Sequence, residues 1–194
     1  MKKILVCGFE PFGNDVTNPS WDAVSSLSDS IGNYNIRKLL LPVVFGEAAA
    51  IAINEADKIS ADAVLCIGQA GGRAAITPEL VGINLRYAEI PDNRGNKPCD
   101  ESVISGGDDA RFSTLPVRKM TEAIKSEGIA AKVSYSAGAY VCNDLLYTLL
   151  SYFDGSKTGV GFIHVPYSRE QQKEPCMDIE DIVRGISAAI GCLD

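Results

Sequence analysis

The stretch Ser134–Phe153, SYSAGAYVCNDLLYTLLSYF, decides how the chain is interpreted. Its pattern is typical of the end of a strand, a short turn that contains glycine, and a helix. Cys142 stands where that helix should begin, so the unpaired N–H groups of the first turn would favour its thiolate. The same N–H groups can stabilise an oxyanion that forms beside the sulfur. Apolar residues at helical spacing predict one buried helix face: Val141, Leu145, Leu146, Leu149, Leu150 and Phe153.

A nucleophile that follows a strand and a tight turn, at the start of a helix, has the logic of a nucleophile elbow with cysteine in place of serine. The alternative for Cys142 is a structural role in the core, because free cysteine is among the most buried residue types. Cysteine catalysis also needs a base, and His164 is the one histidine in the chain. A structural histidine at a strand end is the alternative for His164. A carboxylate would fix the imidazole tautomer, and both Glu79 and Asp92 are candidates.

Strand-like and helical patterns alternate along the whole sequence. We therefore expect an α/β fold, a single three-layer domain over residues 1–194 with a largely parallel, twisted central sheet and helices on both faces. Strands are expected at residues 3–7, 36–44, 63–67, 79–87, 131–136 and 159–165. Helices are expected at residues 20–27, 46–59, 116–127, 142–153 and 178–190.

The candidate functional residues follow the ends of these strands. The loop GFEPFG at 8–13, the loop GQAGGR at 68–73, Cys142 and His164 all fall at or just past a predicted strand end. Ligands of parallel sheets gather outside the carboxyl ends of the strands, so these segments predict one site. The glycines of 68–73 permit a close approach to a ligand, although their spacing does not match a dinucleotide fingerprint and a plain turn is the alternative.

Composition narrows the class of protein. The net charge of −7, without a long basic run, argues against nucleic acid and against anionic membranes as partners. No stretch is long and apolar enough for a membrane span, and the first residues do not form a signal peptide, so the expected location is the cytoplasm. Six cysteines without a CxxC pair, together with a single histidine, argue against a metal site.

Five sequence blocks, in order between residues 8 and 167, together resemble the pyroglutamyl peptidase I family (pyrrolidone-carboxylate peptidases). They are GFEPFG with NPSW, GQAGGRAAITPELVGIN, IPDNRGNKP, YSAGAYVCN and GFIHVPY. The resemblance implies a hydrolase, a thiol protease that acts as an exopeptidase and removes N-terminal pyroglutamyl residues from peptides. It also implies the absence of metal and organic cofactors, and a cytoplasmic homo-oligomer, a dimer or tetramer.

The family's functional positions fall on specific residues of this chain. The nucleophile corresponds to Cys142, the catalytic histidine to His164 and the acidic partner to Glu79. Positions that bind the pyroglutamyl ring correspond to Phe9, Phe12, Gln69, Ile90, Tyr140 and Val141. A pyroglutamyl group is a small neutral lactam, so apolar walls and a few hydrogen bonds, from backbone groups and from Gln69 or Asn18, would suit it. A free N-terminus would bring an ammonium into that apolar pocket, which desolvation disfavours.

Two positions depart from the family pattern: Glu89 stands where relatives often have a basic residue, and Tyr140 where phenylalanine is common. Glu89 leaves open a non-catalytic module on the same fold that binds a small neutral, lactam-like ligand. A nucleoside-phosphorylase-like enzyme is a third interpretation. It would need phosphate-binding cations at the site, for which Arg73 alone is weak support.

Overall fold

The structure, a computed structural model, describes residues 1–193. Its strands are β1 (Lys2–Phe9), β2 (Ser30–Ile31), β3 (Tyr34–Leu41), β4 (Ala63–Gln69), β5 (Thr77–Pro78), β6 (Val81–Ile83), β7 (Ala110–Phe112), β8 (Gly159–Val165), β9 (Tyr167–Ser168) and β10 (Cys176–Met177). Its helices are α1 (Pro19–Ser26), α2 (Glu47–Ile59), α3 (Val117–Ser126), α4 (Val141–Tyr152) and α5 (Ile179–Gly191), with a 3-10 turn η1 (Arg169–Gln171).

The central sheet has six strands in the order β2-β3-β1-β4-β8-β5. β3, β1, β4 and β8 run parallel to one another, whereas β2 and β5 pair antiparallel to their neighbours at the two edges. β4 is buried along its whole length, as expected for a parallel strand that is covered on both faces. The expectation of an α/β fold with a largely parallel sheet is confirmed.

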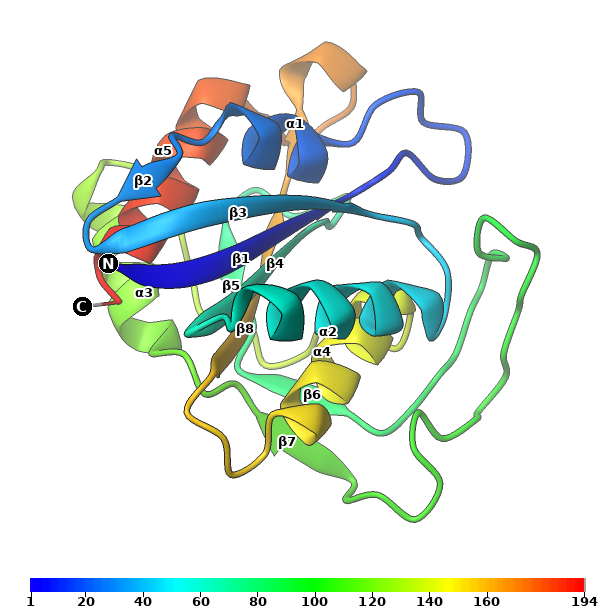
Figure 1. Ribbon diagram of the computed structural model, residues 1–194. Coiled ribbons are helices and arrows are strands. Elements are labelled where there is room, and N and C mark those ends of the chain that lie inside the picture. The colour runs from blue at the N-terminus through cyan, green and yellow to red at the C-terminus, as the bar shows by residue number, and fades with distance from the viewer. Residues whose placement is uncertain (194) are drawn as a thin grey trace.

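Helices cover both faces of the curled sheet (Figure 1). Alternate side chains of β1 point to opposite faces, so Ile4 and Val6 join one hydrophobic core while Leu5 and Cys7 join the other. The first core is closed by α1, α3 and α5, and the second by α2 and α4. The three-layer arrangement therefore has two cores that share one sheet.

The sequence Asn18-Pro19, a favourable N-cap residue followed by proline, marks the start of α1. Asn18 is the N-cap, and its Oδ1 accepts a hydrogen bond from the backbone N–H of Ser20 at 3.1 Å. Pro19 occupies the first helical position, where a missing N–H has no cost. In residues 1–193, no helix combines the length and the apolar character needed to cross a bilayer.

Two strand predictions are wrong in ways that matter for the site. Residues 131–136 form no strand; they make only isolated bridges, from Ala131 to Ile76 and from Ser134 to Glu79. Four backbone hydrogen bonds join residues 130–134 to residues 76–80, beside the short edge strand β5, but the two bridges are interrupted and do not form a continuous ladder. The predicted strand at 79–87 is reduced to β6, which pairs with β7 in a separate two-stranded sheet. The first element of the nucleophile-elbow interpretation is therefore absent.

Candidate active site

Cys142 and His164 both lie at the carboxyl ends of β4 and β8, each next to Gly68. Cys142 is the second residue of α4, and His164 lies near the end of β8, in register with Gly68 of β4. A Cβ atom built on Gly68 would lie 3.0 Å from the Cys142 sulfur. The sulfur therefore occupies the space that a larger residue at position 68 would fill, on the strand beside His164.

Glu79 contacts one ring nitrogen of the His164 imidazole. Its Oε1 lies 2.7 Å from Nδ1 of His164, and both side chains are buried. A carboxylate at this distance accepts a hydrogen bond from Nδ1–H, which leaves Nε2 to exchange protons with a reacting group. Asp92, the other candidate, lies elsewhere and orders its own loop. Its carboxylate accepts hydrogen bonds from the backbone N–H groups of Phe45 and Arg94, at 3.1 and 2.9 Å.

The surroundings set the protonation of this group. Burial, followed by the negative charge of Glu79, raises the pKa of the Cys142 thiol to about 12, although Arg73 and the thiol's own backbone N–H oppose the shift. Burial also lowers the pKa of His164 and outweighs the opposite pull of Glu79. Burial tends to raise the pKa of Glu79 as well, but its hydrogen bond with His164, the charge that His164 carries when protonated, and hydrogen bonds from Ser134 and Arg73 hold that pKa below its ordinary value. At neutral pH the resting site therefore contains the Cys142 thiol, a neutral His164 imidazole and the Glu79 carboxylate.

This resting state differs from the sequence expectation that the helix start would favour a thiolate. The contribution of the N–H at the helix start is present, but desolvation of the sulfur is larger. No side chain caps the start of α4, whose N-cap is Tyr140. The N–H groups of the first turn therefore remain available to a developing oxyanion.

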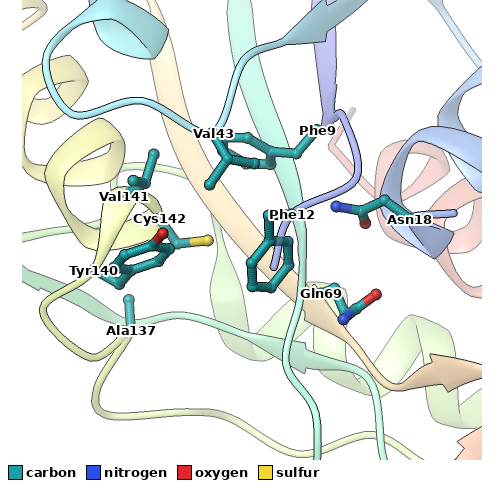
Figure 2. A pocket seen from close by; sticks show the side chains of 9 residues that line it. All are labelled: Phe9, Phe12, Asn18, Val43, Gln69, Ala137, Tyr140, Val141 and Cys142. Carbon is teal, nitrogen blue, oxygen red and sulfur yellow. The ribbon is translucent and has the colours of Figure 1, made fainter. Parts of the chain in front are cut away.

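A small cavity of about 110 Å³ opens beside the Cys142 sulfur. Its lining is mostly apolar and comes from the last residues of β1 and β4, from the segments that follow β1 and β3, and from the start of α4 with the residues just before it (Figure 2). The lining residues are Phe9, Phe12, Asn18, Val43, Gln69, Ala137, Tyr140, Val141 and Cys142. Figure 2 shows the sulfur pointing toward the ring of Phe12. Six of the seven predicted binding residues are thus brought together around one cavity.

Ile90 is the exception among the predicted binding residues. It does not line the cavity, and 47% of its surface is exposed. It lies near the loop that contains Phe12, since a Cβ built on Gly13 would be 3.9 Å from its Cδ1. Glu89, the position that departs from the family pattern, is exposed and does not line the cavity either.

The two amides of the cavity are held in place by other residues. Asn18 accepts hydrogen bonds from Ser20 and donates one to the carbonyl of Glu10 at 2.9 Å. Gln69 donates to Asp15 at 3.2 Å and accepts from the side chain of Gln171 at 2.9 Å. The carbonyl oxygens of both amides therefore have protein partners, and each amide nitrogen keeps a second N–H for a ligand.

Tyr140 anchors a cavity wall. Its hydroxyl donates to the carbonyl of Pro91 at 3.1 Å, and its ring packs edge-on against Phe45 with centroids 5.3 Å apart. Burial raises the pKa of Tyr140 to about 12, so the hydroxyl stays a donor at neutral pH. The hydroxyl that distinguishes Tyr140 from phenylalanine thus ties the loop around residues 91–96 to the start of α4.

Two cavity residues, Val43 and Ala137, were missed by the sequence analysis. Val43 follows the end of β3, so the rule that ligands gather at strand ends could have found it. Ala137 lies within the quoted block YSAGAYVCN, but its small side chain gives no chemical signal. Within residues 1–193, no group of three or more histidine, cysteine or acidic side chains is arranged to hold a metal ion.

Comparisons with known proteins show which proteins this chain is similar to. A family model described as pyroglutamyl peptidase matches residues 2–193. The pyrrolidone-carboxylate peptidase of Staphylococcus haemolyticus is 48% identical over 194 residues, which cover 97% of this chain and 92% of that protein. The crystal structure of pyroglutamyl peptidase I from Bacillus amyloliquefaciens is 41% identical, with a TM-score of 0.96, over 100% of this chain and 97% of that one. The pyrrolidone carboxyl peptidase from Thermococcus litoralis is 34% identical, with a TM-score of 0.95, over 100% of this chain and 93% of that one.

Proposed function

The chain belongs to the pyroglutamyl peptidase family, and from this premise we propose how it removes N-terminal pyroglutamyl residues from peptides. Cys142 is the nucleophile, His164 is the general base and acid, and Glu79 orients His164. The observation that carries this assignment is the 2.7 Å contact between Glu79 Oε1 and His164 Nδ1, with Gly68 lying between His164 on the neighbouring strand and the Cys142 sulfur that lines the cavity.

The first step of the reaction forms a thioester. As His164 Nε2 takes the thiol proton, the Cys142 sulfur attacks the pyroglutamyl carbonyl and a sulfur–carbon bond forms. The N–H groups at the start of α4 stabilise the oxyanion. The carbon–nitrogen bond then breaks, and His164 returns the proton to the leaving amine. Because the resting thiol is protonated and His164 is neutral, proton transfer accompanies attack instead of preceding it.

The second step releases the product. A water molecule gives a proton to His164 and attacks the thioester carbonyl. The carbon–sulfur bond breaks, the sulfur recovers a proton from His164, and free pyroglutamate leaves. Glu79 remains ionised throughout and stabilises the imidazolium that forms in each step.

The cavity suits a lactam ring. Apolar walls surround the ring carbons, and the free N–H groups of the two held amides can donate to the lactam carbonyl. The proposed binding residues are Phe9, Phe12, Asn18, Val43, Gln69, Ala137, Tyr140 and Val141. Ile90 lies outside this set and is proposed only as part of the outer rim, where the remainder of the peptide would leave. The amide of a pyroglutamyl ring is uncharged, whereas the ammonium of an ordinary N-terminus would be desolvated without a counter-ion.

The organisation of the protein is also part of the proposal. We propose that residues 1–194 act as one peptidase domain, because the two cores are built on opposite faces of one sheet. The family resemblance supports a homo-oligomer, a dimer or tetramer, that works in the cytoplasm. Light scattering coupled to gel filtration would test the assembly: a monomer at micromolar concentration would contradict it.

The binding-module and phosphorylase interpretations are not favoured, since the relatives described above carry peptidase names.

The test of the proposed function is the release of a chromophore from an L-pyroglutamyl amide by purified protein, with the L-prolyl amide as control. The prolyl compound has the same ring size but carries an ammonium where pyroglutamate has an amide. We expect turnover of the pyroglutamyl compound alone, and its loss in Cys142→Ala. Equal turnover of both compounds, or unchanged turnover in Cys142→Ala, would overturn the assignment.

A further inference from the structure

We propose that Arg73 is a positioning residue for the catalytic group: it holds the Glu79 carboxylate against His164 and ties it to the segment that leads into Cys142. This inference rests on the proposed function, because it assigns a role to a residue behind the same site. Arg73 is not one of the residues that line the cavity, so its proposed effect on the reaction passes through the residues that it contacts.

The first observation is that Arg73 and His164 share one oxygen. Nη1 of Arg73 lies 2.6 Å from Glu79 Oε1, and Nδ1 of His164 lies 2.7 Å from the same atom. The other carboxylate oxygen, Oε2, is buried and has no hydrogen-bond partner in the described part of the chain. Because Oε2 has no partner, the orientation of the Glu79 carboxylate depends on the two donors that converge on Oε1.

Arg73 also reaches the backbone of His164 through Thr77. Its Nη1 donates to Thr77 Oγ1 at 2.6 Å, and that hydroxyl donates to the backbone carbonyl of His164 at 3.3 Å. Thr77 and His164 are paired residues of β5 and β8. One guanidinium therefore fixes Glu79 relative to both the side chain and the main chain of His164.

A third contact extends to the nucleophile's segment. Nη2 of Arg73 donates to the carbonyl of Ser136 at 3.1 Å. Ser136 precedes Ala137, which lines the cavity, and Cys142 follows a few residues later. Backbone hydrogen bonds join this segment to residues 76–80 only as far as Ser134, so the bond to Ser136 adds a constraint beyond the last of them. Arg73 is the residue that connects the acid, the base and the approach to the nucleophile.

The charges around His164 make the role measurable. The charged groups that act on the imidazole are Glu79 and Arg73, the latter on the loop after β4. The same two groups act on the Cys142 thiol on α4, which also interacts with the Cys66 thiol on β4. The positive charge of Arg73 lowers the pKa of His164. Its removal raises that pKa, so the acidic limb of the activity profile moves to higher pH. Replacement by lysine keeps the charge but cannot make the forked contacts to Glu79 and Ser136 together.

The test compares Arg73→Gln and Arg73→Lys with a matched control, Arg111→Gln. Arg111 has a similar exposure to Arg73, 24% against 27%, and pairs with Asp108 and Asp154 away from the cavity. Three quantities are measured: kcat and KM for the pyroglutamyl amide across pH, the folded fraction by circular dichroism, and the rate at which iodoacetamide alkylates Cys142. Alkylation is read by mass spectrometry of the peptide that contains Cys142, since other cysteines also react.

In Arg73→Gln we expect kcat to fall roughly 10- to 100-fold, the size of effect seen when partners that orient a metal ligand are removed. KM should be unchanged, and the acidic limb should move to higher pH in both turnover and alkylation. Arg73→Lys should keep the wild-type limb and lose less of kcat, and Arg111→Gln should match the wild type.

Two results would overturn the inference. One is a kcat within twofold of wild type and an unmoved acidic limb in Arg73→Gln. The other is an equal loss in both Arg73 variants that is accounted for by unfolded protein. If the wild type cleaves no pyroglutamyl amide, the proposed function fails, yet the pH profile of alkylation still decides whether Arg73 acts on the Cys142–His164 pair.

Discussion

Gly68 and the Cys142 sulfur share a space that only a residue without a side chain leaves open. A Cβ built on Gly68 would lie 3.0 Å from Cys142 Sγ and 2.7 Å from Cζ of Phe162. Gly68 also pairs with His164 across β4 and β8. The absence of a side chain at Gly68 therefore lets the Cys142 sulfur pack against β4, next to the position of β8 that carries His164.

We expect Gly68→Ala to displace the sulfur or the Phe162 ring. Overpacking of this kind costs about 1–3 kcal/mol of the free energy of unfolding. A displacement of the nucleophile by about 1 Å lowers kcat on the order of 10²-fold. The control is Gly185→Ala, whose Cβ would lie 2.5 Å from Cδ1 of Ile76 in the other core. If both variants lose stability but both keep kcat per folded molecule, the sulfur's position does not depend on Gly68.

Glu79→Gln tests the contact with His164. The amide keeps the shape of the carboxylate but neither stabilises an imidazolium nor dictates the Nδ1–H tautomer, so kcat should fall on the order of 10²- to 10⁴-fold. Asp92→Asn is the matched comparison, because Asp92 is also buried but holds the loop at 92–96. We expect that variant to lose stability and to raise KM, while its acidic limb stays in place. A greater loss of kcat in Asp92→Asn than in Glu79→Gln would reverse the assignment.

The pH dependence of stability follows from the directions of two shifts. The pKa of His164 is lowered from 6.5 in the folded protein, so below 6.5 the unfolded chain binds a proton that the folded protein resists. The contribution of His164 to the free energy of unfolding is therefore full above pH 6.5 and is lost as the pH falls toward its folded pKa. The pKa of Cys142 is raised from 9.0 to about 12, so its contribution is full below pH 9.0 and is lost as the pH rises toward 12.

Denaturant titrations of the wild type, His164→Gln and Cys142→Ala across this range would check both signs. In a plot of the free energy of unfolding against pH, we expect the acid side to flatten in His164→Gln and the alkaline side to flatten partly in Cys142→Ala. The alkaline effect is partial because burial also raises the pKa of the Cys66 thiol. A wild-type protein that becomes more stable between pH 6.5 and the onset of acid unfolding would contradict the account of His164.

Gln171→Glu tests whether the amide of Gln69 is held for substrate. The new carboxylate keeps the acceptor for the Ser168 N–H, but it removes the donor to Gln69 Oε1. One hydrogen bond contributes about 0.5–1.5 kcal/mol, so we expect KM to rise roughly 2- to 10-fold with little change in kcat. Gln172→Glu adds the same charge at the neighbouring exposed position and should leave KM unchanged. Equal KM values in the two variants would show that Gln69 needs no such support.

Much of the fold could be predicted from local pattern. The buried strand at 159–165 has the bounds of β8, and Asn18-Pro19 gave the start of α1, because apolar runs and caps depend on residues that are near in sequence. The segment at 131–136 has the same local character, but it pairs with residues 76–80 only through interrupted bridges, and the extent of such pairing is set by the tertiary fold. Propensity therefore failed at the sheet edge.

The candidate site likewise has features that local sequence predicts and features that only the tertiary structure shows. The blocks around Cys142 and His164 pointed to the reacting groups that we propose, whereas the preference for Glu79 over Asp92 needed the three-dimensional contact between Glu79 and His164. The thiolate expectation failed because sequence shows a helix start but not the burial of the sulfur, which dominates its pKa. From the sequence, Arg73 stands out only as a candidate phosphate ligand. Its contact with Glu79 depends on the three-dimensional path of the loop after β4, which sequence patterns do not show.

The central claim is that Cys142 carries the pyroglutamyl group as a thioester, and rapid-quench mass spectrometry tests it most directly. The wild type would be mixed with an activated pyroglutamyl ester, quenched in acid within the first turnover and digested. We predict a mass increase of one pyroglutamyl group on the peptide that contains Cys142, and none with the matching prolyl ester. An adduct on a different cysteine, or full turnover without any adduct in wild type together with turnover in Cys142→Ala, would contradict the account.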